Sequence, residues 1–146
     1  IGTGIISVGG TGKLTLDACA GCTISGIRFN STAAVGGAAL TLSGAGSRNI
    51  IRDCWFYTST GGGIYTANNY TWIERCYLSA CAGNGIEVAA GVTAGPFINQ
   101  CTVVSGSAWG IVDTPDLAFI DQCVVTGNAS GQIDSASTYL GKNKVT

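Results

Sequence analysis

The feature that most constrains the fold is a sequence repeat of 22 to 25 residues. Four segments share the pattern bulky, Ile, polar, polar, Cys, any residue, bulky, and they cover residues 50–56, 72–78, 97–103 and 119–125. An isoleucine follows ten residues after each cysteine. The cysteines are Cys54, Cys76, Cys101 and Cys123, and the isoleucines are Ile64, Ile86, Ile111 and Ile133. Two features with the same irregular spacing indicate a repeated structural unit.

Weaker copies precede these four. A fifth copy and a partial sixth have apolar residues in equivalent positions, namely Ile24, Ile27, Phe29, Leu40 and Leu42, and then Leu14 and Leu16. The repeats therefore cover residues 14–145. We expect residues 1–146 to be a single segment of a longer polypeptide, because the chain starts with Ile and carries no recognisable signal peptide.

A period of this length occurs in leucine-rich repeats and in parallel β-helices. The chain has only seven leucines, and its repeats are rich in β-branched and aromatic residues and in Gly, Ser and Asn. The first group favours strands, and the second favours turns. Apolar residues at helical spacing are missing. We therefore predict an all-β, single-stranded parallel β-helix (a solenoid) of about six rungs, with neighbouring rungs about 4.8 Å apart.

Strand alternation places the cysteines in one inward column and the isoleucines in another, with the polar pair before each cysteine at a corner. Stacked cysteines have Cβ atoms too far apart for a disulfide, so we expect free thiols, which are typical of a reducing compartment. Cys19 and Cys22 have the spacing of metal ligands, but no second pair follows them and the chain has no histidine. We expect neither a metal nor a cofactor.

The pattern Ile-x-x-Cys-x-bulky, followed after about seven residues by Gly-Ile, resembles the right-handed parallel β-helix of pectate lyases and bacteriophage tailspikes. The resemblance covers residues 14–145 and implies a right-handed solenoid. The aspartate cluster of a pectate lyase, with its supporting Arg or Lys, is missing. A high content of Gly, Ser, Thr and Ala with 10% charged residues is more similar to a phage tailspike or tail fibre. That similarity implies a homotrimer on a virion tail, assembled in the bacterial cytoplasm.

Charge and hydropathy argue against two classes of partner. Seven Lys and Arg residues are spread along a chain of net charge -1, which leaves no basic patch for nucleic acid. Polar residues interrupt every apolar stretch, so no segment reaches the roughly 18 residues that a membrane-spanning helix needs. We expect neither nucleic-acid binding nor membrane insertion.

Two outward columns carry large apolar side chains. Trp72, Phe97 and Phe119 occupy the position before the repeated isoleucine, and Trp55 and Tyr77 follow their cysteines. A monomer rarely exposes a patch of this size. Burial of each ring would contribute roughly 1.5 to 3 kcal/mol, so we expect these five residues to form the oligomer interface. The alternative is that loops or a flanking segment of the same chain cover them.

The outward column after the Gly-Ile position contains the candidate site. Glu87 and Asp134 lie in it two rungs apart, which is about 9.6 Å between backbones. This approaches the upper limit of about 9.5 Å for the carboxylate pair of an inverting glycosidase. We predict Glu87 and Asp134 as catalytic residues and Tyr65 as a substrate-binding residue that stacks on sugar. The enlarged loop 89–95 is expected to wall this groove. A solvated outer face is the alternative interpretation.

The remaining charged residues are expected to be structural. Arg52 and Asp53 face Glu74 and Arg75 in the neighbouring rung with opposite charges, so we predict mutual compensation at the surface. Asp113 and Asp116 flank the Thr-Pro sequence at 114–115 and are expected to form a turn.

Three functions are compatible with these features. The first is a phage tailspike or tail-fibre segment that recognises a bacterial surface polysaccharide, with or without cleaving it. The second is a secreted polysaccharide lyase or hydrolase similar to pectate lyases. The third is a structural shaft or adhesin segment without a ligand. The exposed aromatic columns favour the first, and the sequence leaves open whether the segment is a glycosidase, a lyase or not an enzyme.

Overall fold

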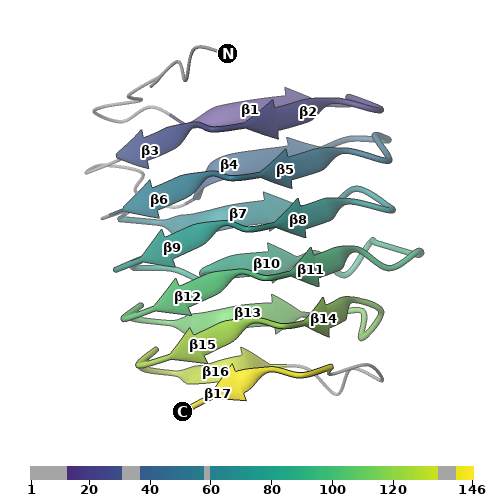
Figure 1. The fold of residues 1–146 in the computed structure, drawn as a ribbon. Coiled ribbons are helices and arrows are strands. Elements are labelled where there is room, and N and C mark those ends of the chain that lie inside the picture. The colour runs from purple at the N-terminus through teal and green to yellow at the C-terminus, as the bar shows by residue number, and fades with distance from the viewer. Residues whose placement is uncertain (1–12, 31–36, 58–59, 135–140) are drawn as a thin grey trace.

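The chain winds through three parallel β-sheets that run the length of the molecule (Figure 1). The computed structural model describes residues 13–30, 37–57, 60–134 and 141–146. Every regular element in this part of the chain is a strand. Each turn of the chain adds one strand to each sheet, which gives five complete rungs and a sixth that consists of β16 and β17. The predicted all-β parallel solenoid is confirmed.

The strand order within each sheet follows directly from this winding. The first sheet contains β1 (Leu14–Asp17), β4 (Ala38–Ser43), β7 (Gly62–Thr66), β10 (Ile86–Val88), β13 (Trp109–Asp113) and β16 (Gly131–Asp134). The second contains β2 (Thr23–Ser25), β5 (Ile50–Arg52), β8 (Trp72–Glu74), β11 (Phe97–Asn99) and β14 (Phe119–Asp121). The third contains β3 (Arg28–Asn30), β6 (Trp55–Tyr57), β9 (Tyr77–Ser79), β12 (Thr102–Val104), β15 (Val124–Thr126) and β17 (Lys144–Val145).

The register between rungs is the one that the sequence repeat predicts. Ile86 pairs with Ile64 on one side and with Ile111 on the other, and all three side chains are fully buried. Ile133 continues the column in the last described rung, where it is partly buried. The four repeat cysteines are also buried. The two predicted inward columns therefore form the core.

The weaker N-terminal copies adopt the same register. Phe29 pairs with Phe56, and their rings stack with centroids 4.5 Å apart and an interplanar angle of 2°. Leu14 pairs with Leu40, which in turn pairs with Ile64. These contacts extend one continuous apolar core from the first rung to the last described one.

The glycines before Ile64, Ile86 and Ile111 leave no room for a Cβ atom, although Ala39 and Gln132 occupy the equivalent positions in the second and the last described rung. A Cβ atom on Gly63, Gly85 or Gly110 would collide with a side chain of the third sheet and with a carbonyl oxygen of the next rung. For Gly85 these groups are the Val103 side chain and the Gly110 carbonyl. The first and third sheets therefore approach each other closely through these glycines.

The corner between the second and third sheets is a single residue in the left-handed backbone conformation. Asp53, Arg75, Gln100 and Gln122 have φ angles of 54°, 50°, 53° and 52°. In an L-residue this conformation costs about 1 to 2 kcal/mol. The corners are linked between rungs, because the amide of Arg75 donates to the Asn99 carbonyl (3.1 Å) and that of Gln100 to the Asp121 carbonyl (3.1 Å).

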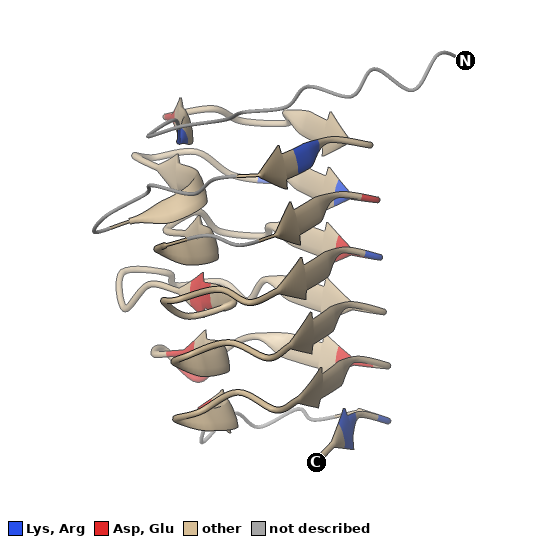
Figure 2. Cartoon of the chain, turned by 90° about the vertical axis from the view of Figure 1, so that its left-hand side faces the viewer, with Lys and Arg blue, Asp and Glu red and all other residues tan. Residues whose placement is uncertain are grey.

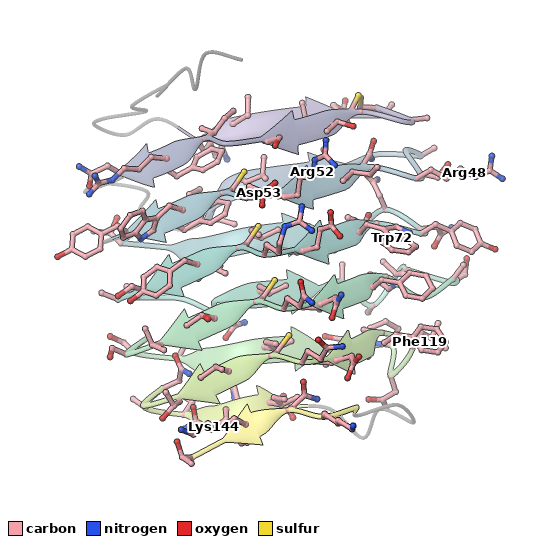
Figure 3. The ribbon with its side chains drawn as sticks, in the orientation of Figure 1. Arg48, Arg52, Asp53, Trp72, Phe119 and Lys144 are labelled. Atoms are coloured by element: carbon pink, nitrogen blue, oxygen red, sulfur yellow. A yellow bond between two sulfur atoms is a disulfide. The ribbon has the colours of Figure 1, made fainter. Side chains whose placement is uncertain are left out.

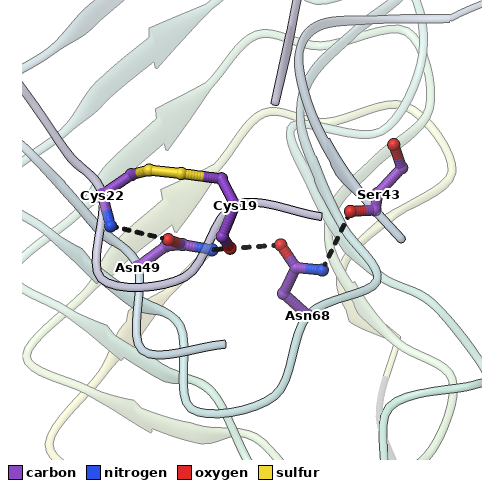
Figure 4. The surroundings of a disulfide bond; sticks show 5 residues. All are labelled: Cys19, Cys22, Ser43, Asn49 and Asn68. Atoms are coloured by element: carbon purple, nitrogen blue, oxygen red, sulfur yellow. Dashed lines mark hydrogen bonds between the residues drawn. A yellow bond between two sulfur atoms is a disulfide. The ribbon is translucent and has the colours of Figure 1, made fainter. Parts of the chain in front are cut away.

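The free thiols predicted for the stacked cysteines are confirmed, whereas Cys19 and Cys22, considered only as a metal-ligand pair, form a disulfide in the turn between β1 and β2 (Figure 4). Their Cα atoms are 6.2 Å apart, within the usual range for a disulfide. The sequence argument considered only stacked cysteines in neighbouring rungs, whereas this pair closes a local turn. The five other cysteines are free and buried.

A buried pair of asparagines supports this turn from below (Figure 4). Asn49 accepts a hydrogen bond from the Cys22 amide (2.9 Å) and donates to the Cys19 carbonyl (2.9 Å) and to Asn68 Oδ1 (3.1 Å). Asn68 donates in turn to the carbonyls of Ser43 (3.3 Å) and Gly44 (3.0 Å). Two side chains thus bridge the turns of three successive rungs.

Candidate functional site

A groove of about 530 Å³ lies on the outer face of the first sheet. Thr41, Tyr65 and Glu87 come from β4, β7 and β10 and occupy adjacent rungs. The turns that lead into these strands form one wall, with residues 60–62 and 82–84, and Lys13 lies at the N-terminal end. The groove therefore crosses several rungs along the solenoid axis.

Glu87 is held in place within the groove. Its Oε2 accepts a hydrogen bond from Asn84 Nδ2 at 2.9 Å, and Asn84 Oδ1 accepts one from the Trp109 amide at 3.3 Å. Asn84 is therefore fixed by the next rung and orients the carboxylate. Sequence analysis missed Asn84 because the equivalent positions in the neighbouring rungs are occupied by Gly62 and Trp109, so no repeated polar pattern marks this position.

The predicted catalytic pair is only partly brought together. Val112 lies between Glu87 and Asp134 in the register, so the two carboxylates are two rungs apart as predicted. Asp134 is exposed, however, and the described residues that line the groove do not include it. Tyr65 and Glu87 share the groove, and Asp134 lies beyond its C-terminal end.

The predicted role of the loop 89–95 is wrong, because the loop lies at the opposite end of β10 from the groove-lining turn. The amides of Thr93 (2.9 Å) and Ala94 (3.1 Å) donate to Asn69 Oδ1, and Val92 is buried in the core. These contacts attach the loop to the corner between the first and second sheets. The groove wall is formed instead by the turns that precede β7 and β10.

Both predicted aromatic columns point outward. On the second sheet, the rings of Trp72 and Phe97 stack at 4.7 Å, and those of Phe97 and Phe119 at 4.9 Å. Trp72 and Phe119 are 46% and 41% exposed, and Figure 3 shows both on the same edge of the molecule. The second sheet thus presents a continuous strip of rings.

The third sheet carries the other aromatic column. Trp55 and Tyr77 meet edge to face with centroids 5.4 Å apart, and the Arg28 guanidinium lies 5.1 Å from the centre of the Trp55 ring. Both rings are exposed. Sequence analysis missed the contribution of Arg28, which only the register between β3 and β6 reveals.

Charge is sparse on the molecule and is compensated at the corner between the second and third sheets (Figure 2). Arg75 donates to both carboxylate oxygens of Asp53, at 2.8 and 3.1 Å, and also lies 3.1 Å from Glu74. The hydrogen bonds from Arg75 lower the pKa of Asp53 below its usual value. The predicted compensation is confirmed for Asp53 and Arg75, whereas among the described residues Glu74 forms its ion pair with Arg75 and not with Arg52.

The remaining acidic and thiol groups have structural roles. Asp113 accepts a hydrogen bond from the Ala118 amide (2.7 Å), and Asp116 has a φ of 57°, so the predicted turn is confirmed. Burial raises the pKa of Cys81 to about 12. Contacts with neighbouring thiols, together with burial, raise the pKa of Cys101 well above its usual value. The buried Cys81 thiol therefore stays protonated and unreactive.

The part of the chain that the structure describes contains no group of three or more His, Cys, Asp or Glu side chains that could hold a metal ion. Within the same ranges, no helix has the length and apolar character required to cross a membrane.

These features define a parallel β-helix with an open groove on one sheet and exposed aromatic columns on the other two. A family model described as "Right handed beta helix region" matches residues 2–145. The chain therefore belongs to the right-handed β-helix family, and the predicted handedness is confirmed. No curated protein and no solved structure matches the chain. A β-helix domain of this family is consistent with proteins that bind or degrade polysaccharides.

Proposed function

We propose that this chain is the β-helix segment of a bacteriophage tailspike or tail fibre and that its groove binds a bacterial surface polysaccharide. The observation that carries the proposal is the placement of Tyr65 and Glu87 on adjacent rungs of one groove. An aromatic ring can pack against the apolar face of a sugar, and a carboxylate can accept hydrogen bonds from its hydroxyl groups.

The shape of the groove favours a polymer over a compact metabolite. It extends over several rungs of a solenoid, so successive sugar units can occupy successive rungs. Most of its lining residues are small or uncharged, with one carboxylate at Glu87 and one ammonium group at Lys13. This low net charge favours a polysaccharide of low charge density. The proposed location is the virion tail, after assembly in the bacterial cytoplasm.

In this proposal the polysaccharide binds in the groove, and its cleavage would also require Asp134. In an inverting mechanism Glu87 and Asp134 would act as general acid and base on opposite sides of the sugar. Because Asp134 lies outside the groove, a substrate would have to extend past β13 to contact both carboxylates.

Substitutions in the groove provide the test. Tyr65→Ala and Glu87→Gln are each expected to weaken binding to the recognised polysaccharide about tenfold, because each removes a contact worth about 1 to 2 kcal/mol. Binding is measured with an array of immobilised bacterial polysaccharides and then by calorimetry with the recognised one.

Asp134→Asn is the matched control, since it changes a carboxylate of the same column outside the groove. It is expected to leave binding unchanged. Loss of oligosaccharide release in both Glu87→Gln and Asp134→Asn would identify the two carboxylates as a catalytic pair. Unchanged binding in both groove variants would contradict the proposal and favour a structural shaft.

We further propose that the aromatic columns form the interface of a homotrimer with its threefold axis along the stacking direction. Trp72, Phe97, Phe119, Trp55 and Tyr77 would be buried between protomers. Sedimentation equilibrium is expected to give three times the chain mass at micromolar concentration, and Trp72→Ser with Phe119→Ser is expected to yield monomers because it removes two apolar anchors. A monomeric wild-type protein under these conditions would contradict the proposal.

A further inference from the structure

A second hollow, of about 710 Å³, lies at the corner where the chain passes from the first sheet to the second. Its lining residues are Arg48, Ile50, Tyr70 and Trp72. They come from two successive rungs, because Ile50 pairs with Trp72 and the other two residues precede these strands by two positions. The hollow is therefore built from other residues than the groove on the first sheet.

The backbone holds Arg48 and Tyr70 in equivalent positions one rung apart. Both have left-handed φ angles, 57° and 52°. The Arg48 amide donates to the Asn69 carbonyl (3.0 Å), and the Tyr70 amide donates to the Ala94 carbonyl (3.3 Å). Each turn is thus tied to the next one. Figure 3 shows Arg48 extending outward at the same edge of the molecule as Trp72.

The side chains of this hollow combine one cation with two half-exposed rings. Arg48 is exposed and takes part in neither of the two ion pairs found among the described residues, both of which belong to Arg75. Tyr70 is 50% exposed and Trp72 46% exposed. The Trp72 ring is braced by Phe97 in the next rung, so it offers a supported apolar face.

We propose that this hollow binds a sugar residue that carries a carboxylate. A guanidinium group forms two parallel hydrogen bonds with a carboxylate, which an ammonium group cannot reproduce. Tyr and Trp rings provide a large apolar surface together with a polar end, which suits a pyranose ring with its apolar face and its hydroxyl edge. Arg48 therefore binds the carboxylate of the sugar, and Tyr70 and Trp72 pack against the pyranose ring.

This site is chemically different from the groove. The groove carries the carboxylate of Glu87, which repels an acidic sugar, whereas the hollow carries the guanidinium of Arg48, which forms no ion pair with the other described residues. The proposal therefore does not rest on the function proposed for the groove. Trp72 also belongs to the column assigned to the trimer interface, and a Trp72 ring buried between protomers could not hold a sugar. The two proposals therefore exclude each other at Trp72, and binding is measured on the protein in its natural association state.

The test compares methyl β-glucuronide with methyl β-glucoside, which share the ring and differ in the carboxylate. Binding is followed by tryptophan fluorescence and by the NMR shift of the Trp72 indole N–H. The glucuronide is expected to bind about tenfold more tightly than the glucoside. Arg48→Gln is expected to abolish this difference, and Tyr70→Ala is expected to weaken binding of both sugars.

Arg52→Gln is the matched control, because Arg52 is another exposed arginine of the same rung that does not line the hollow. It should leave the preference for the glucuronide intact, as should Tyr65→Ala and Glu87→Gln in the groove. Equal affinity for the two sugars, an unchanged preference in Arg48→Gln, or no binding because association covers the hollow would each overturn the proposal.

Discussion

Replacing Gly85 by alanine is expected to lower the free energy of unfolding by about 3 kcal/mol, the upper end of the range for overpacked cores. The added Cβ would meet the Val103 side chain and the backbone carbonyl of Gly110. A side chain can change its rotamer, but a carbonyl within a sheet can move only with its strand. The first and third sheets would therefore have to separate at this rung. Urea denaturation followed by circular dichroism measures the effect.

Gly91→Ala is the control for this substitution. Gly91 lies in the loop 89–95, and a Cβ atom there has no neighbour within 4 Å. Its expected effect is neutral or a stabilisation of up to about 1 kcal/mol, because alanine restricts the unfolded chain. A Gly85→Ala protein as stable as Gly91→Ala would show that the sheets are not closely packed at this position.

Asn49→Ala is expected to destabilise the protein by about 3 kcal/mol. Asn49 is 1% exposed, and its amide group is the partner of the Cys22 amide and the Cys19 carbonyl. Each buried polar group left without a partner costs about 1 to 3 kcal/mol. The same urea titration, carried out without reductant so that the disulfide stays intact, measures the loss.

Gln100→Ala is the control for Asn49→Ala. Both substitutions remove a side-chain amide, but only Asn49 is buried. Gln100 Nε2 donates a hydrogen bond to Gln122 Oε1 in the next rung at 3.2 Å, but the Gln100 side chain is exposed to water. Its removal is expected to change stability by less than about 0.5 kcal/mol. If Asn49→Ala and Gln100→Ala have similar effects, the Asn49 network does not stabilise the first rungs.

The parts of the fold that repeat were predictable from the sequence. The column of Ile64, Ile86 and Ile111 and the column of cysteines follow from spacing alone, because a parallel solenoid places equivalent residues one above another. The outward direction of Trp72 and Glu87 follows from strand alternation in the same register. Periodicity therefore determined the core and the composition of each outer face.

The features that sequence analysis missed do not obey the repeat. Asn49 and Asn68 are 19 residues apart rather than 22, so they occupy different positions of the repeat and yet are hydrogen-bonded. The disulfide of Cys19 and Cys22 forms within one turn, where a rule about stacked rungs does not apply. The groove wall also depends on turn conformations, which a repeat pattern of strand residues does not specify.

The pairing of strands between neighbouring rungs also determines the order in which the rungs unfold. Each strand pairs only with the strands of the rungs directly above and below, so the rungs form a linear array with nearest-neighbour coupling. In such an array the end rungs open first, and amide protons exchange most slowly near the middle. A local defect at Gly85 would then uncouple the two halves, whereas one in the first rung would only shorten the folded array.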